Sequence, residues 1–142
     1  EESIRECAVT KEILQMRHLD LAGARHICEC YDDHISDAKG TTELVFLTLE
    51  LCGQNLKQVF VEPHRLRKTS DVNVARELTR QLLEGIAFLQ RLNPPIIHHD
   101  LKPANLAFNG NTLKILDWGA AIRATSENSV RDVVASWLYK PP

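Results

Sequence analysis

Two short stretches in the second half of the chain combine residue types that could carry out chemistry. Residues 97–105 read I-H-H-D-L-K-P-A-N, and residues 114–119 read K-I-L-D-W-G. Their candidate functional side chains are Asp100, Lys102, Asn105 and Asp117. Carboxylate and amide oxygens are hard ligands that suit Mg²⁺, and a neighbouring lysine would neutralise a phosphate. This inventory fits phosphoryl transfer, in which one carboxylate orients the attacking hydroxyl and the other oxygens hold metal on the phosphates.

Two other interpretations of the first stretch need no phosphate. A polar turn stabilised by its own hydrogen bonds is one of them, but it leaves the second stretch unexplained. His98 and Asp100 also begin the pattern of a two-histidine, one-carboxylate iron site. That site needs a distal histidine on a β-rich scaffold, and the helical context argues against it.

A long helix is predicted to deliver the chain into this polar loop. Ser70 or Asp71 can cap it, and Asn93-Pro94-Pro95 ends it after Leu92. The apolar stripe expected to face the core comprises Val74, Leu78, Leu82, Ile86 and Leu89.

A hairpin is predicted to bring the two stretches together. Residues 106–108 and 112–116 flank Asn109-Gly110-Asn111, and an Asn-Gly pair is a strong hairpin signal. Because a hairpin places the outer ends of its strands side by side, we expect Asp100, Lys102, Asn105 and Asp117 to converge.

The first half of the chain reads as a helix, a small piece of sheet and a second short helix. We expect burial of Leu44, Phe46 and Leu49 in its second strand. The expected elements are a helix at 3–20 stopped by Ala22-Gly23, a strand at 26–31, a polar turn at 32–42, a strand at 43–51 and a helix at 56–61.

Composition predicts an ordinary globular chain of roughly one domain. The 142 residues are 44% hydrophobic and 25% charged, and the net charge of -2 gives no reason to expect a nucleic-acid or anionic-membrane partner. The chain has no run of about 18 apolar residues, so no membrane segment is predicted. Its acidic start does not resemble a signal peptide. The four cysteines, at 7, 28, 30 and 52, form no zinc pattern. We therefore expect free thiols and an intracellular protein, cytoplasmic or nuclear.

The stretch H-H-D-L-K-P-A-N followed by D-W-G resembles the protein-kinase catalytic loop and magnesium-binding motif, H-R-D-L-x-x-x-N and D-F-G. The resemblance implies ATP and Mg²⁺ as cofactors and a protein as substrate. It implies that Asp100 is the catalytic base, that Lys102 neutralises phosphate, and that Asn105 and Asp117 are metal ligands. The lysine two residues after Asp100 resembles the pattern of serine/threonine kinases and not that of tyrosine kinases.

The likeness extends toward both ends of the chain. Residues 11–19 resemble the αC helix, which implies that Glu12 pairs with the ATP-anchoring lysine, with Glu6 as an alternative. Residues 134–142 resemble the segment before the A-P-E motif. There Ser136 replaces the threonine that touches the catalytic aspartate and lysine.

Residues 44–53 resemble the strand that enters the hinge between the kinase lobes. By that resemblance Leu49 is the gatekeeper, and the backbone of Glu50 and Cys52 meets adenine. Whether a partner protein completes a larger assembly is left open.

The implied fold is α+β and protein-kinase-like, with part of the small lobe and the upper part of the helical large lobe. Residues 1–142 would form a partial domain. In it, 1–49 run from the αC helix to the strand that enters the hinge, 50–54 are the hinge, and 55–142 hold the catalytic loop and activation segment. No glycine-rich loop or V-A-I-K lysine precedes Glu12. We therefore expect a window of a larger domain, inactive by itself.

Departures from the kinase pattern leave two functions in competition. His99 replaces the arginine that normally pairs with an activation-loop phosphate, which argues against switching by phosphorylation. Trp118 replaces phenylalanine and offers an extra N–H donor to hold the turn. An active kinase and a pseudokinase that binds or scaffolds are both compatible with these residues. A small-molecule kinase fits less well, because L-K-P and residues 134–142 resemble a peptide-substrate platform.

Overall fold

The computed structural model describes residues 2–15, 20–38, 42–61 and 72–125. The helices are α1 (Glu2–Gln15), α2 (Leu21–Ala24), α3 (Leu56–Val61) and α5 (Val72–Arg91), with a 3₁₀ turn η2 at Pro103–Asn105. The strands are β1 (Cys30–Ala38), β2 (Thr42–Leu49), β3 (Ile96–Ile97), β4 (Leu106–Asn109), β5 (Thr112–Ile115) and β6 (Ile122–Arg123). This mixture confirms the predicted α+β class.

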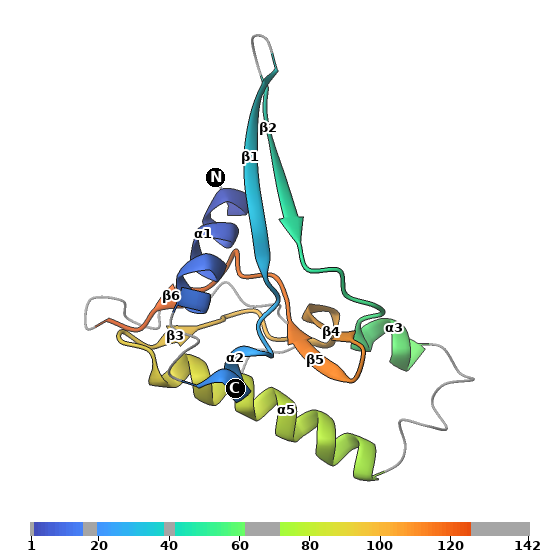
Figure 1. Ribbon diagram of the computed structural model, residues 1–142. Coiled ribbons are helices and arrows are strands. Elements are labelled where there is room, and N and C mark those ends of the chain that lie inside the picture. The colour runs from blue at the N-terminus through green and yellow to red at the C-terminus, as the bar shows by residue number, and fades with distance from the viewer. Residues whose placement is uncertain (1, 16–19, 39–41, 62–71, 126–142) are drawn as a thin grey trace.

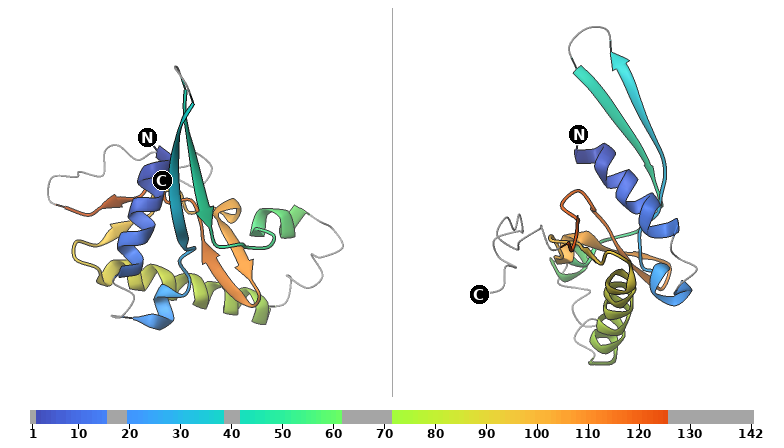
Figure 2. Two further views of the ribbon diagram at one scale, coloured as in Figure 1. Left: turned by 45° about the horizontal axis from the view of Figure 1, so that its top comes forward. Right: turned by 90° about the vertical axis from the view of Figure 1, so that its left-hand side faces the viewer.

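The strands form antiparallel pairs: β1 with β2, β3 with β6, and β4 with β5. The β1–β2 hairpin projects from the body with α1 beside it, and α5 runs along the opposite side of the molecule (Figures 1 and 2). The β4–β5 hairpin lies between the β1–β2 hairpin and α5 (Figure 1). Strand β5 also pairs with a segment other than β4. Ile27 makes a parallel bridge to Ile115, so β5 has neighbours along both edges.

The core is built where α5 meets β5. Fully buried side chains there include Ile27, Phe88, Leu113, Ile115 and Trp118. A Cβ on Gly85 would lie 2.9 Å from Ile115 Cδ1, so the missing side chain is what allows the helix to approach this closely. The buried face of α5 is Gln81, Gly85, Phe88 and Leu89.

This face is rotated from the stripe that periodicity predicts. Leu89 is buried as expected, but Val74 is exposed and Leu78, Leu82 and Ile86 are only partly covered. Apolar periodicity missed Gln81 and Gly85, because a polar side chain and a glycine carry no hydrophobic signal.

Gly23 lies inside a helix and does not end one. The predicted helix at 3–20 is α1, ending at Gln15, followed by α2, whose N-cap Asp20 accepts a hydrogen bond from Gly23 N at 3.1 Å. A Cβ on Gly23 would lie 2.5 Å from Phe88 Cβ. Glycine is therefore needed for the contact between α2 and α5.

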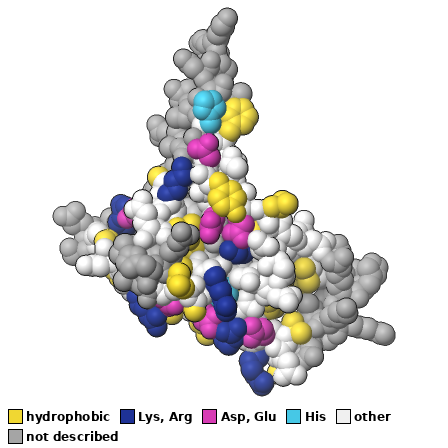
Figure 3. Space-filling view, viewed as in Figure 1, with side chains coloured by type: hydrophobic (Ala, Val, Ile, Leu, Met, Phe, Trp, Pro, Cys, Tyr) yellow, Lys and Arg dark blue, Asp and Glu magenta, His cyan; other side chains and the backbone are white. Residues whose placement is uncertain are grey.

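The polar turn predicted at 32–42 is wrong, because Asp32–Ala38 belongs to strand β1. Its residues pair with β2 from Asp32↔Thr48 to Ala38↔Thr42, and cross-strand pairing outweighs their low strand propensity. The predicted burial of Phe46 and Leu49 is also wrong, since they are 53% and 43% exposed. Hydrophobic side chains are visible along this hairpin in Figure 3.

One cysteine contradicts the prediction of four free thiols. Cys30 is disulfide-bonded, whereas Cys28 and Cys52 are free. The intracellular location therefore stays a prediction with less support. Within the ranges described above, no helix is long and apolar enough to cross a membrane.

Candidate active site

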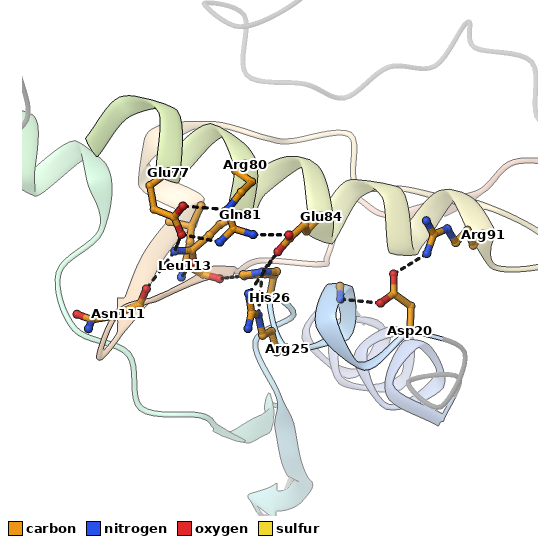
Figure 4. Close-up of polar contacts among 11 residues, drawn as sticks. Asp20, Arg25, His26, Glu77, Arg80, Gln81, Glu84, Arg91, Asn111 and Leu113 are labelled. Carbon is orange, nitrogen blue, oxygen red and sulfur yellow. Dashed lines mark hydrogen bonds and ion pairs between the residues drawn. The ribbon is translucent and has the colours of Figure 1, made fainter. Parts of the chain in front are cut away.

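The predicted hairpin is confirmed and forms the frame of the site. Its register runs from Leu106↔Ile115 to Asn109↔Thr112, and Gly110 takes a left-handed φ of 59° in the turn. Gln81 holds this turn against α5: its Oε1 accepts from Leu113 N at 2.7 Å, and its Nε2 donates to Asn111 O at 3.2 Å. Figure 4 shows these contacts.

The four side chains predicted to converge do so around the amide of Asn105. Its Nδ2 donates to Oδ2 of Asp100 and to Oδ2 of Asp117, both at 3.2 Å, and to the Asp100 carbonyl at 3.0 Å. Lys102 Nζ is ion-paired with Asp100 Oδ2. The backbone of Asn105 is itself held in place, because Leu116 N donates to the Asn105 carbonyl oxygen at 2.9 Å. The loop and the strand end thus form one cluster.

Burial within the cluster is graded. Asn105 is 6% exposed, Asp100 and Lys102 are partly covered, and Asp117 is exposed. The side-chain nitrogen of Asn105 already donates to carboxylate and carbonyl oxygens. The side-chain oxygen is therefore the atom that could ligate a metal ion. Together with the exposed Asp117 carboxylate this makes an all-oxygen set, which fits Mg²⁺.

His98 is a scaffold for the loop. It is buried; Nδ1 accepts from Asp100 N at 3.2 Å, and Nε2 pairs with Leu116 O at 2.9 Å. Burial lowers the pKa of His98, so the ring is neutral at neutral pH with its proton on Nε2. Since both ring nitrogens already have hydrogen-bond partners, the iron-site interpretation fails.

The D-W-G turn is anchored by its tryptophan. Trp118 Nε1 donates to Ile115 O at 3.2 Å, which confirms the predicted extra hydrogen bond. Its ring contacts His98 at a centroid distance of 4.7 Å. Asp117 and His99 have φ values of 64° and 68°, a left-handed conformation that costs energy in residues other than glycine and often marks functional sites. Neither left-handed residue is predicted from the sequence.

Glu12 contacts a different partner from the one that the resemblance implies. It lies in α1 and is ion-paired with Arg123 of β6, shortly after the D-W-G turn. Its pairing with an ATP-anchoring lysine stays a prediction. The predicted role of Ser136 lies outside the described residues.

The predicted hinge runs along β4. Gly53 N donates to Phe108 O at 2.6 Å, and Asn55 bridges to Ala107. Leu49 ends β2, and Cys52 is half-buried with a pKa raised by burial. The backbone proposed to meet adenine is thereby attached to the hairpin that carries Asp117.

A loop aspartate and a strand-end aspartate are joined by an asparagine and lie beside a lysine, which is the arrangement that the resemblance to protein kinases implies. Comparison with known proteins agrees with this class. The family model described as protein kinase domain matches residues 1–142, and the chain belongs to that family.

Several curated protein kinases are similar to this chain. It is 33% identical to mitogen-activated protein kinase 3 of Arabidopsis thaliana, over 91% of the chain and 41% of that protein. It is 36% identical to a calcium/calmodulin-dependent serine/threonine-protein kinase of Malus domestica, over 82% of the chain and 27% of that protein. It is 28% identical to serine/threonine-protein kinase plk-1 of Caenorhabditis elegans, over 94% of the chain and 19% of that protein. The chain thus spans less than half the length of these relatives.

Proposed function

We propose that the protein containing this chain transfers the γ-phosphoryl group of ATP to serine or threonine hydroxyls of protein substrates. The observation that carries the proposal is the Asn105 amide, which donates to one carboxylate oxygen of Asp100 and one of Asp117 at the same 3.2 Å. Phosphoryl transfer depends on positioning a hydroxyl and the phosphates together, and this amide fixes the separation of the two carboxylates that would do so.

Each side chain of the cluster has a distinct role in this proposal. Asp100 orients the substrate hydroxyl and accepts its proton. Lys102, which is ion-paired with Asp100, neutralises the transferred phosphoryl group. Asn105 and Asp117 would hold Mg²⁺, which when bound screens the charge on the phosphates. The neutral His98 ring bonds the backbone of Asp100 and that of Leu116, the residue before Asp117, and so ties the loop to the strand end.

The test is a magnesium-dependent phosphoryl-transfer assay on the full-length protein with a general protein substrate. Asp100→Asn and Asp117→Ala should each lower kcat by about a hundredfold or more, the scale of a lost general base or charge-stabilising group. Asp32→Asn, the equivalent change at an exposed residue of strand β1, serves as the matched control and should leave kcat unchanged. Equal activity of Asp117→Ala and wild type would refute the proposal.

A pseudokinase that binds or scaffolds is the second candidate. His99 in place of arginine and the Glu12–Arg123 ion pair favour it, because that ion pair occupies the carboxylate expected to pair with the ATP-anchoring lysine. The wild-type protein would then show no phosphoryl transfer, whether or not a nucleotide raises its melting temperature. Transfer that Asp117→Ala abolishes would exclude it.

The partners and the location of the protein are also proposed. The family suggests a protein substrate, and the near-neutral charge gives no reason to expect nucleic acid. We keep the intracellular, cytoplasmic or nuclear, location as a proposal, supported by the free thiols of Cys28 and Cys52. Fractionation of cells that express the tagged full-length protein would test it.

A further inference from the structure

A buried carboxylate lies in the predicted hinge, beyond the cluster described above. The Glu50 and Lys114 side chains are 9% and 10% exposed, and Lys114 Nζ lies 2.8 Å from Glu50 Oε2. Asn109 Nδ2 donates to Glu50 Oε1 at 2.7 Å, and Glu29 N donates to Oε2 at 3.2 Å. Each oxygen of this carboxylate is therefore held by a defined donor.

The pKa of Glu50 reflects this environment. Burial by itself would raise the pKa, but the hydrogen bonds from Lys114, Asn109 and Glu29 outweigh it and hold the pKa below its ordinary value. Glu50 is thus charged at neutral pH in spite of its burial.

The donors around Glu50 come from segments distant in the chain. Lys114 belongs to β5, Asn109 ends β4, and Glu29 precedes β1. Lys114 Nζ also donates to Ile27 O at 3.5 Å, on the other edge of β5. Glu50 therefore joins its own segment to both edges of the strand that leads into Asp117.

The backbone around Glu50 is fixed by the same surroundings. Glu50 N donates to Glu29 O at 2.8 Å, and Gly53 N donates to Phe108 O at 2.6 Å. The side-chain contacts of Glu50 and these backbone contacts hold the start of the predicted hinge, whose backbone would meet adenine. Lys114 lies three residues before Asp117.

We propose that Glu50 and Lys114 are positioning residues that fix the adenine-binding backbone relative to the catalytic hairpin. Neither side chain touches the reacting atoms; the ion pair sets the distance between the segment that holds the base of ATP and the strand that presents Asp117. The inference rests on the proposed ATP-dependent function; it adds Lys114 to the residues found from the sequence and gives the Glu50 side chain a role of its own.

The energetics of buried ion pairs favour a positioning role over a purely stabilising one. Desolvation of two charges cancels most of their attraction, so such a pair adds little net stability compared with a packed apolar pair. It does impose a defined geometry, because a misplaced partner would leave a buried charge without compensation. Here the geometry that it imposes is the register of the hinge on the catalytic hairpin.

The test is a double-mutant cycle in the full-length protein with Glu50→Gln, Lys114→Met and the combined variant. KM for ATP, kcat, the Kd of a fluorescent ATP analogue and the melting temperature are measured for each. We expect KM and Kd to rise about tenfold in either single variant, within the coupling range of contacting residues, with kcat changed by less than about threefold. The combined variant should match the single variants, because the shared interaction is lost only once.

The matched control is Arg91→Met, which removes the exposed ion pair between Arg91 and Asp20 and should leave KM and Kd unchanged. A lower melting temperature with unchanged KM and Kd would overturn the inference, and so would single-variant effects that multiply in the combined variant. If a single variant does not fold, the combined variant decides alone, and a wild-type KM and Kd there overturn the proposal. Failure of wild type to bind the nucleotide would instead refute the proposed function, and the inference with it.

Discussion

Replacing Gln81 by leucine should destabilise the fold by removing the hydrogen bonds that hold the β4–β5 hairpin on α5. Gln81 is buried, and its Oε1 accepts from Leu113 N at 2.7 Å. Its Nε2 donates to Asn111 O at 3.2 Å and to Glu77 Oε1 at 2.9 Å. Leucine has a similar volume, so the change removes the polar contacts and leaves little cavity.

The magnitude follows from the fate of each partner. Leu113 N is buried and would lose its acceptor, which costs about 1–3 kcal/mol. Asn111 and Glu77 are exposed and can bond to water, so their loss adds little. A total near 2 kcal/mol would lower Tm by about 4–8 °C, given about 2–4 °C per kcal/mol in domains of about 150–250 residues.

Thermal unfolding of the full-length protein, followed by circular dichroism or calorimetry, measures the effect. Gln90→Leu makes the same change at an exposed position of the same helix and should alter stability by less than about 0.5 kcal/mol. Equal Tm values for the Gln81→Leu and Gln90→Leu proteins would refute the reasoning. They would mean that leaving the buried Leu113 N–H without an acceptor costs no free energy of unfolding.

The other predictions concern single contacts and use the same melting assay. Burial lowers the pKa of His98, so the unfolded chain takes up the proton first; the stability due to the neutral ring is complete above the ordinary value of 6.5 and falls as pH drops below it. The loss of Tm between about pH 7.5 and about pH 5.5 should be smaller in His98→Phe, and an equal loss would contradict the neutral ring. Gly23→Ala places a Cβ 2.5 Å from Phe88 Cβ and should cost about 1–3 kcal/mol, an outcome that a wild-type Tm would exclude. Arg123→Ala breaks an exposed ion pair with Glu12 and should cost less than about 1 kcal/mol; a larger loss would mean that the pair is shielded from solvent.

Local signals in the sequence sufficed to predict the cluster around Asn105. The Asn-Gly turn sets the hairpin within a few residues, and the positions of Asp100, Asn105 and Asp117 follow from its geometry. The strand β1 was missed because its residues are polar, and only pairing with β2 makes them a strand. Local composition predicts structure well where the determining contacts are close in sequence.

The sequence by itself determined the family, the hairpin and the side chains that meet at Asn105, because motif spacing and turn chemistry are short-range properties. Only the tertiary structure decided that Glu50 pairs with Lys114, that Glu12 pairs with Arg123, and that Gln81 holds the hairpin turn. These partners are distant in the chain, and their meeting depends on how helices and strands pack. Burial then selects which polar groups must be paired, and composition carries no record of that choice.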